Sequence, residues 1–167
     1  VNVKGAFFCS QAAARAMGRR GGRIINLADV GAERAWPGYI PYAISKAGVV
    51  MLTRGLAAAL APRIQVNAVG PGAVLLPEDF PRESKRRLRA KIPMGRLGHP
   101  DDVTAAVRFF ATCPSYITGQ ILYVDGGATA VGGATARSAE HAARRQMGSR
   151  LRTRRTEDMG HSALRGV

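Results

Sequence analysis

The stretch Ile25–Lys46, "INLADVGAERAWPGYIPYAISK", contains the clearest signals of secondary structure in the chain. Its first residues belong to a short apolar run, Arg23–Leu27, which follows a pair of glycines and predicts a buried strand. A segment rich in Gly and Pro comes next and predicts a loop. The following residues, Tyr42–Ala61, contain no proline and end just before Pro62, which predicts a long helix. A buried strand, a loop and a helix in this order are typical of an α/β fold.

The same alternation continues on both sides of this stretch. A helix is predicted before it, over Val3–Met17, because apolar residues recur there at helical spacing. Further elements are predicted after it: strands in 64–72 ("IQVNAVGPG") and 119–127 ("GQILYVDGG"), and helices in 85–91 and 99–112. Apolar strands separated by helices predict a doubly wound parallel sheet of the Rossmann type.

The composition is that of a globular protein, with 167 residues of which 46% are hydrophobic and 22% charged. The chain is long enough for one domain with a core. An unbroken run of about 18 apolar residues does not occur, so we expect no membrane-spanning segment. Cys9 and Cys113 form no motif and suit a reducing compartment, which predicts a cytoplasmic protein.

The net charge of +14 raises the question of nucleic-acid binding. Eight arginines lie between Arg137 and Arg165 against three acidic residues, and a second basic group spans 82–89, where we expect a solvated helix face. Aromatic residues do not alternate with these basic residues, as they would in a protein that binds single strands. We therefore predict no nucleic-acid function, and interpret residues 131–167 as a basic, disordered tail that follows a domain over 1–130.

Tyr42 and Lys46 suggest proton chemistry at the start of the long helix. Residues four apart lie on one helix face, and a neighbouring ammonium group lowers the pKa of a phenol by favouring the phenolate. A tyrosine tuned in this way exchanges a proton near neutral pH. The pair follows a buried strand, so it is expected at the carboxyl ends of the strands, where open α/β sheets bind ligands. The turn in "NAVGPGAV" would let the backbone approach a cofactor there.

These motifs together resemble the short-chain dehydrogenase/reductase family. Six pieces between Asn2 and Gly127 carry the resemblance: "VNVKGAFF", "GRIINLADV", "YAISKAGV", "VNAVGPGAV", "RLGHPDDV" and "ITGQILYVDGG". The resemblance implies that Tyr42 donates the proton, that Lys46 binds the nicotinamide ribose and tunes Tyr42, and that Asn2 helps to hold a proton-relay water. It further implies that Pro71, Gly72 and Val74 lie against the nicotinamide, and that the protein forms a homodimer or homotetramer.

Asp29 departs from the family pattern. It stands thirteen residues before Tyr42, where the family usually has serine, and residues 11–44 contain no Ser or Thr. An ionised carboxylate only accepts hydrogen bonds and would repel the oxyanion of a ketone reduction, whereas a carboxylic acid beside a C=N bond can protonate the nitrogen. The pattern resembles the pteridine reductase branch, which implies a dihydropterin or dihydrofolate substrate and NADPH, with NADH as an alternative. Two alternatives remain open: a carbonyl reductase or alcohol dehydrogenase, such as a 3-oxoacyl-carrier-protein reductase, and an inactive fragment with a basic nucleic-acid-binding tail.

Other polar and aromatic residues are further candidates for the site. Trp36 and Tyr39 follow Asp29 closely and could stack on a planar substrate or simply pack in the loop. The three histidines have no ligand spacing with acids or cysteines, which predicts no metal site. Asp125 is expected to shape the turn after its strand, and Asn67 to satisfy backbone groups.

The Gly-rich turn with which this family holds the cofactor pyrophosphate has no counterpart in the sequence. The glycine pairs at 21–22, 126–127 and 132–133 do not open a strand-to-helix phosphate site. We therefore expect the chain to be the C-terminal part of a reductase. The first βαβ units, and the residue that chooses NADP over NAD, are expected upstream of Val1.

Overall fold

The computed structural model describes residues 2–34 and 36–131. The main elements follow in the predicted order: α1 (Asn2–Met17), β1 (Gly22–Leu27), α2 (Ile40–Leu60), β2 (Ile64–Pro71), α3 (Arg82–Ala90), α4 (Pro100–Thr112) and β3 (Ile121–Val124). Short 3-10 turns occupy Gly18–Arg20, Val30–Ala32 and Pro37–Tyr39. The predicted tail, apart from Val131, lies outside the described residues.

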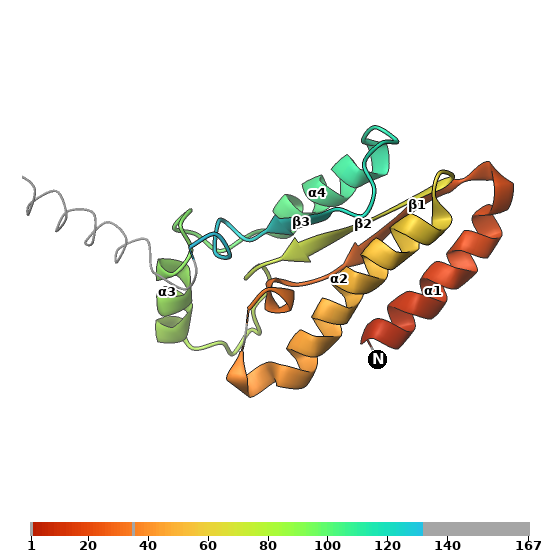
Figure 1. Cartoon of the computed structure of the whole chain (residues 1–167). Coiled ribbons are helices and arrows are strands. Elements are labelled where there is room, and N and C mark those ends of the chain that lie inside the picture. Colours follow the sequence, from red (N-terminus) through yellow and green to blue (C-terminus); the bar gives the residue numbers. More distant parts are fainter. Residues whose placement is uncertain (1, 35, 132–167) are drawn as a thin grey trace, which may run out of the picture.

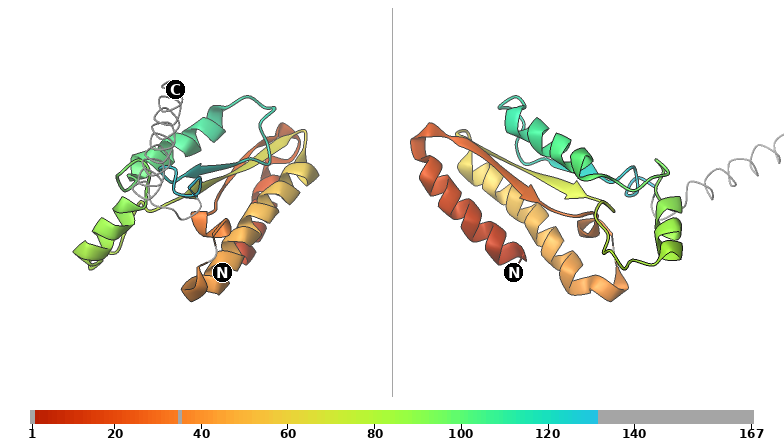
Figure 2. Two further views of the ribbon diagram at one scale, coloured as in Figure 1. Left: turned by 60° about the vertical axis from the view of Figure 1, so that its left-hand side comes forward. Right: turned by 180° about the vertical axis from the view of Figure 1, so that it is seen from behind.

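The three strands form one parallel sheet in the order β1-β2-β3. Ile24 pairs with Val66, and Val69 pairs with Leu122. Helices α1 and α2 cover one face of the sheet and α4 covers the other (Figures 1 and 2). The predicted parallel α/β architecture is thereby confirmed.

Burial on both faces explains why the strands are continuous apolar runs. Val66 and Val69 of β2 have no exposed surface and point to opposite faces. Val66 packs with Ile24 and Ala57 on the side of α1 and α2, whereas Val69 packs with Phe110 on the side of α4. Successive side chains of a strand alternate between the two faces, so each run supplies both halves of the core.

Helix α2 begins at Ile40, two residues before the predicted start. Pro41 lies in its first turn, where the missing backbone N–H costs no hydrogen bond. The stretch Pro37–Leu60 is apolar and long enough to cross a membrane by length and composition. It is not an unbroken apolar run, because Lys46 and Arg54 lie within it. In this fold the apolar side of α2 packs on the sheet, through residues that include Val49, Val50 and Ala57.

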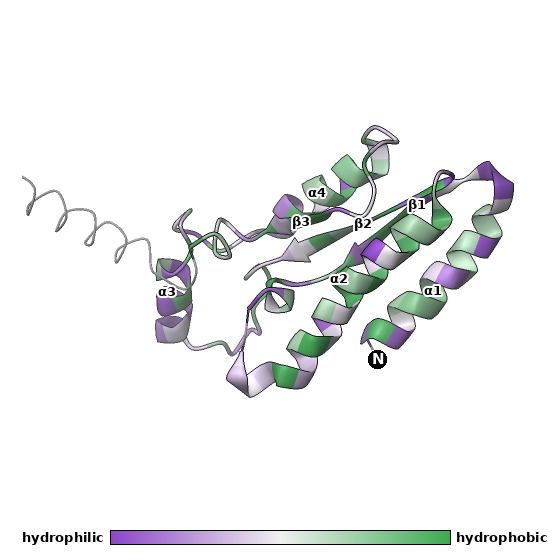
Figure 3. Cartoon of the chain, viewed as in Figure 1, coloured by the Kyte–Doolittle hydropathy of each residue, from purple (hydrophilic) through white to green (hydrophobic). Residues whose placement is uncertain are grey.

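Helix α3 differs from the others because it contributes no buried residue. It begins at Arg82, three residues earlier than predicted, and lies beyond the carboxyl ends of the strands (Figure 1). Figure 3 shows that it is strongly hydrophilic, whereas α1 and α2 are mostly apolar. Its position follows from the connection after β2, which carries the chain past the end of the sheet.

The buried hydroxyl of Thr53 provides a first test of the packing between β1 and α2. It accepts a hydrogen bond from Asn26 Nδ2 (3.0 Å) and donates one to the Val49 carbonyl (2.8 Å). Thr53→Val keeps the shape but leaves the buried Asn26 amide without this partner, so the free energy of unfolding should fall by about 1–3 kcal/mol. Urea unfolding measures the change. Thr53→Ser, which keeps the hydroxyl, should lose less; equal stability of Thr53→Val and wild type would contradict the prediction.

Candidate active site

Asp29 and Tyr42 meet beyond the carboxyl end of β1. Asp29 caps the 3-10 turn Val30–Ala32, and its Oδ1 accepts a hydrogen bond from the Gly31 amide (2.6 Å). Tyr42, in the first turn of α2, donates its hydroxyl proton to Asp29 Oδ2 (2.9 Å). Both carboxylate oxygens therefore accept hydrogen bonds, and each keeps acceptor capacity for another donor.

Lys46 lies one helical turn after Tyr42 and fastens α2 to β1. Its Nζ donates to the carbonyl oxygens of Leu27 (3.1 Å) and Ala28 (3.2 Å). An ammonium group has three donors, so one remains free among the described contacts. This free donor at the carboxyl edge suits a ribose hydroxyl, and the residues present therefore fit the nicotinamide half of an NAD(P) cofactor.

The pKa of Tyr42 is shifted in the direction opposite to the one predicted from the sequence. Burial of the phenol raises the pKa of Tyr42 from 10.0 to about 12, and the hydrogen bond to Asp29 and its negative charge act in the same direction. The prediction that Lys46 lowers this pKa is wrong for this arrangement. The physical reason is distance: Asp29 touches the hydroxyl, whereas Lys46 Nζ is 5.7 Å from the ring centroid and points to backbone carbonyls.

Asn2 reaches the site only indirectly. Its Nδ2 donates to Ser45 Oγ (2.9 Å), and Ser45 Oγ donates to the Tyr42 carbonyl (2.7 Å). This chain of hydrogen bonds joins the start of α1 to the first turns of α2. The role predicted for Asn2 in holding a relay water remains a prediction, since the amide contacts Ser45 rather than the Tyr42 hydroxyl or the Lys46 ammonium.

Trp36 and Tyr39 form an edge-to-face pair beside the Asp29 turn. Their ring centroids are 6.2 Å apart at an angle of 74°. Trp36 lies over Gly31, where an added Cβ would come within 3.3 Å of the indole. Tyr39 is 65% exposed and keeps an open face. The two rings stand where a planar substrate could pass, and their predicted role in substrate binding stays a prediction.

Pro71, Gly72 and Val74 follow β2 at the same edge of the sheet. Gly72 donates its amide proton to the Val124 carbonyl (3.0 Å). A Cβ on Gly72 would lie 2.9 Å from the Cα and Cβ of Asp125. Glycine is therefore required here by the approach of Asp125, which gives a different reason from the predicted approach to a cofactor. The contact of these three residues with the nicotinamide remains a prediction.

The two structural roles expected for Asn67 and Asp125 are confirmed. Asn67 donates to the Ile117 carbonyl and accepts from the Gln120 amide. Asp125 accepts hydrogen bonds from the Gly127 amide and from the Thr129 amide and hydroxyl. Burial raises the pKa of Asp125, but these hydrogen bonds outweigh it and leave the pKa below its ordinary value.

Sequence reasoning missed a second tyrosine–carboxylate pair. Tyr123 of β3 donates its hydroxyl proton to Glu33 Oε1 (2.8 Å), and the pKa of Tyr123 is raised by burial and by this hydrogen bond. Ninety positions separate the two residues, and no motif signalled the contact. It fixes the loop after Asp29 to the edge strand, so the position of that loop depends on β3.

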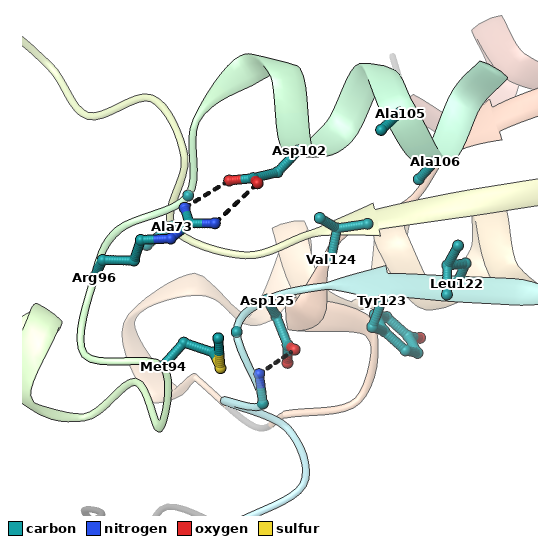
Figure 4. Close-up of a pocket in the computed structure, with 13 residues that line it drawn as sticks. Ala73, Met94, Arg96, Asp102, Ala105, Ala106, Leu122, Tyr123, Val124 and Asp125 are labelled. Carbon is teal, nitrogen blue, oxygen red and sulfur yellow. Dashed lines mark hydrogen bonds and ion pairs between the residues drawn. The ribbon is translucent and has the colours of Figure 1, made fainter. Parts of the chain in front are cut away.

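A cavity of about 450 Å³ lies between α4 and the end of β3 (Figure 4). Figure 4 shows Arg96 and Asp102 turned toward each other across it, joined by hydrogen bonds of 2.7 and 2.9 Å. None of the predicted catalytic residues lines this cavity. It is therefore a neighbour of the Asp29–Tyr42–Lys46 site on the other side of the sheet edge.

Comparisons with known proteins agree with this geometry. Residues 1–129 match a family profile described as enoyl-(acyl carrier protein) reductase. The chain belongs to the short-chain dehydrogenase/reductase family. Members of this family are oxidoreductases, so the coarse class expected from the sequence is confirmed.

Three relatives illustrate the similarity. A (2S)-[(R)-hydroxy(phenyl)methyl]succinyl-CoA dehydrogenase subunit of Thauera aromatica is 42% identical, over 76% of this chain and 53% of its own length. A 3-oxoacyl-[acyl-carrier-protein] reductase of Thermotoga maritima is 40% identical, over 76% and 54%. The structure of a gluconate 5-dehydrogenase from Burkholderia cenocepacia, in complex with NADP and tartrate, is 38% identical over 78% and 54%, with a TM-score of 0.73.

The chain spans about half the length of the curated relatives that it matches. Within that half, this short-chain dehydrogenase/reductase has the predicted Rossmann-type sheet. The pteridine reductase branch is not among the relatives described above, and the functions named for them involve carbonyl and hydroxyl groups.

Burial is the main cause of the raised Tyr42 pKa, and the carboxylate of Asp29 should account for a smaller part of it. In Asp29→Asn the negative charge is lost, so the Tyr42 pKa should fall from about 12 toward 10.0. Near-ultraviolet absorbance during alkaline titration measures this, with the Tyr42→Phe variant subtracted to isolate one phenol. In wild type, the stability linked to this shift is complete below pH 10.0 and is lost as the pH rises through about 12.

Glu33→Gln provides the control for this titration. It removes the carboxylate that accepts from Tyr123 and should leave the titration of Tyr42 unchanged. If Tyr42 titrated at the same pH in Asp29→Asn as in wild type, its raised pKa would owe nothing to Asp29.

Proposed function

We propose that the complete protein interconverts a secondary hydroxyl and a ketone on an acyl thioester, with NAD(P) as cofactor. The single observation that carries this proposal is the hydrogen bond from Tyr42 to Asp29, with Lys46 one turn further along α2. The names of two relatives support the substrate class, since one acts on a succinyl-CoA derivative and the other on a 3-oxoacyl carrier protein.

Asp29 is the proton acceptor in this proposal. Its Oδ2 already accepts from Tyr42 and has capacity for one further donor, such as a substrate hydroxyl. During oxidation the hydroxyl proton moves to the carboxylate as the C=O bond forms, and in reduction it returns to the oxygen. Bound NAD(P) supplies the hydride acceptor or donor. Lys46 holds the ribose with its free donor, and Tyr42 fixes the orientation of the carboxylate.

An ionised Asp29 favours the hydroxyl form of the substrate. A hydroxyl donates a hydrogen bond to the carboxylate, whereas a ketone oxygen only accepts and is repelled. Tyr42 donates to Asp29 rather than into the site, and its raised pKa keeps it protonated at neutral pH. The site is therefore arranged to bind an alcohol more tightly than the corresponding ketone, so KM should be lower for the alcohol than for the ketone.

A second candidate is the reduction of a C=N bond in a dihydropterin or dihydrofolate with NADPH. The replacement of serine by Asp29 favours it, because a carboxylic acid can protonate a ring nitrogen. Trp36 and Tyr39 could stack on the ring system. We rank it second because the substrates named for the relatives are thioesters and a sugar acid.

We further propose that the protein works in the cytoplasm as a homo-oligomer. Cys9 and Cys113 are free thiols, as suits a reducing compartment. Helices α1 and α2 expose apolar side chains on their outer face, including Phe8 (53% exposed), Ile44 (66%) and Met51 (63%). Covering such a face with a second copy of the chain would remove this apolar surface from water.

Asp29→Ser tests the proposed base. The overall equilibrium constant fixes the ratio of kcat/KM in the two directions, so the effect of Asp29 must be sought in the individual KM values. In the complete protein, KM for a 3-hydroxyacyl-CoA should rise about tenfold in Asp29→Ser, because a hydrogen bond to a charged group is lost. KM for the 3-oxoacyl-CoA should fall, since serine donates to the ketone. Steady-state rates with both cofactors measure these values.

The control variant is Asp101→Ser, which removes an exposed acid at the start of α4. It should leave both KM values unchanged. Unaltered KM values in Asp29→Ser would make Asp29 a purely structural cap of its turn. If the wild-type protein turned over dihydrobiopterin with NADPH faster than either thioester, the second candidate function would replace the first.

A further inference from the structure

Helix α3 concentrates positive charge at the end of the molecule where the site lies. Its nine residues, "RESKRRLRA", include five basic residues and one acid. No residue of α3 is buried, so these charges are not needed for the core. Figure 1 places α3 at the same end of the molecule as the carboxyl ends of the strands and the start of α2.

The internal contacts of α3 leave most of this charge unneutralised. Glu83 forms ion pairs with Arg86 (3.0 Å) and Arg87 (3.1 Å), so one acid serves two cations. Arg89 donates its Nε proton to the Gly95 carbonyl (2.6 Å). Arg82 and Lys85 form no ion pair within residues 2–34 and 36–131.

A groove of about 840 Å³ runs along α3. The basic side chains of the helix, together with Glu83, form one wall, and the segment after it forms an apolar floor that includes Ile92, Pro93 and Leu97. This volume is in the range of small-molecule sites. A concave surface with cationic walls and an apolar floor fits a ligand that joins phosphates to an apolar or aromatic part.

The segment Ile92–Gly98 connects this groove to the carboxyl edge of the sheet. The Met94 amide donates to the Gly126 carbonyl (3.1 Å), and the Gly98 amide donates to the Ala73 carbonyl (2.9 Å). Ala73 lies between Gly72 and Val74, which were predicted to touch the nicotinamide. The segment that lines the groove is therefore attached to the chain that follows β2, at the end of the sheet where the site lies.

We propose that the α3 groove binds the phosphate-bearing nucleotide end of a coenzyme A thioester. This inference rests on the proposed function, which places a thioester substrate at Asp29 and Tyr42. Arginine forms paired hydrogen bonds with phosphate, and the five basic residues match the several negative charges of coenzyme A. The apolar floor accommodates the adenine or the start of the pantetheine arm. A concave groove suits this small ligand better than the convex surface of a carrier protein.

The kinetic test compares two thioesters of the same acyl group in the complete protein. One carries coenzyme A, and the other carries pantetheine, which has the same arm without the nucleotide. In Arg82→Gln/Lys85→Gln, KM for the coenzyme A thioester should rise about tenfold, because two phosphate-binding charges are lost. KM for the pantetheine thioester and kcat for both should stay unchanged.

The matched control is Arg19→Gln/Arg108→Gln. It removes the same charge from two exposed positions outside the groove and should leave all four constants unchanged. If the α3 variant showed a similar rise in KM for both thioesters, the proposal would be overturned. The helix would then affect substrate binding in general and not the nucleotide of coenzyme A. Unchanged KM values for both thioesters in the α3 variant would also overturn the proposal.

Binding of free coenzyme A separates this inference from the proposed function. Calorimetry should detect coenzyme A binding to wild type and about tenfold weaker binding to the α3 variant, with pantetheine weaker in both. If coenzyme A bound in this way but no thioester were turned over, the proposed reaction would be wrong, whereas the proposed coenzyme A site would be supported. Equal affinity of the wild type and the α3 variant for coenzyme A would overturn the proposal that the groove binds it. If only an acyl-carrier-protein thioester responded to the variant, a protein partner would replace coenzyme A.

Discussion

Lys46 connects the helix that carries the reactive tyrosine to the strand that carries the acid. Its ammonium donates to the last carbonyls of the β1 segment, at Leu27 and Ala28. Asp29 follows these carbonyls directly, so the same contact sets the distance between the carboxylate and Tyr42. The hydroxyl–carboxylate hydrogen bond and the position of the free third donor of Lys46 both depend on this attachment.

Asp29 has two roles, and it accepts a hydrogen bond in each of them. As a cap it must remain an acceptor for the Gly31 amide, and as a partner of Tyr42 it stabilises the neutral phenol. A serine in its place could also accept from an amide, but it would add no negative charge. In the proposed reaction, the carboxylate rather than the tyrosine therefore serves as the base. The proposed chemistry of this member of the family consequently depends on one side chain next to an otherwise ordinary Tyr-x-x-x-Lys pair.

Much of the fold could be predicted because each strand is buried on two faces and each helix has clear ends. The run "RIINL" and the proline after α2 carry enough local information for this. The proximity of Asp29 and Tyr42 was also predictable, since both follow elements that meet at one edge. The pKa of Tyr42 was not, because spacing along a helix does not reveal where the Lys46 ammonium points. The Glu33–Tyr123 contact was hidden for another reason: it joins residues from distant segments through tertiary packing alone.

The segment Ile92–Gly98 is a wall shared by two hollows. Ile92, Pro93, Gly95 and Leu97 face the α3 groove, whereas Met94, Arg96 and Gly98 face the cavity beside α4. Its backbone hydrogen bonds to Ala73 and Gly126 restrict the movement of the segment toward either cavity. If a larger side chain is introduced on one side of this segment, the segment can make room for it only by moving toward the other side. That movement would narrow the cavity on the other side. The sizes of the two compartments are thus not independent variables, and substitutions that remodel one are constrained by what the other must still contain.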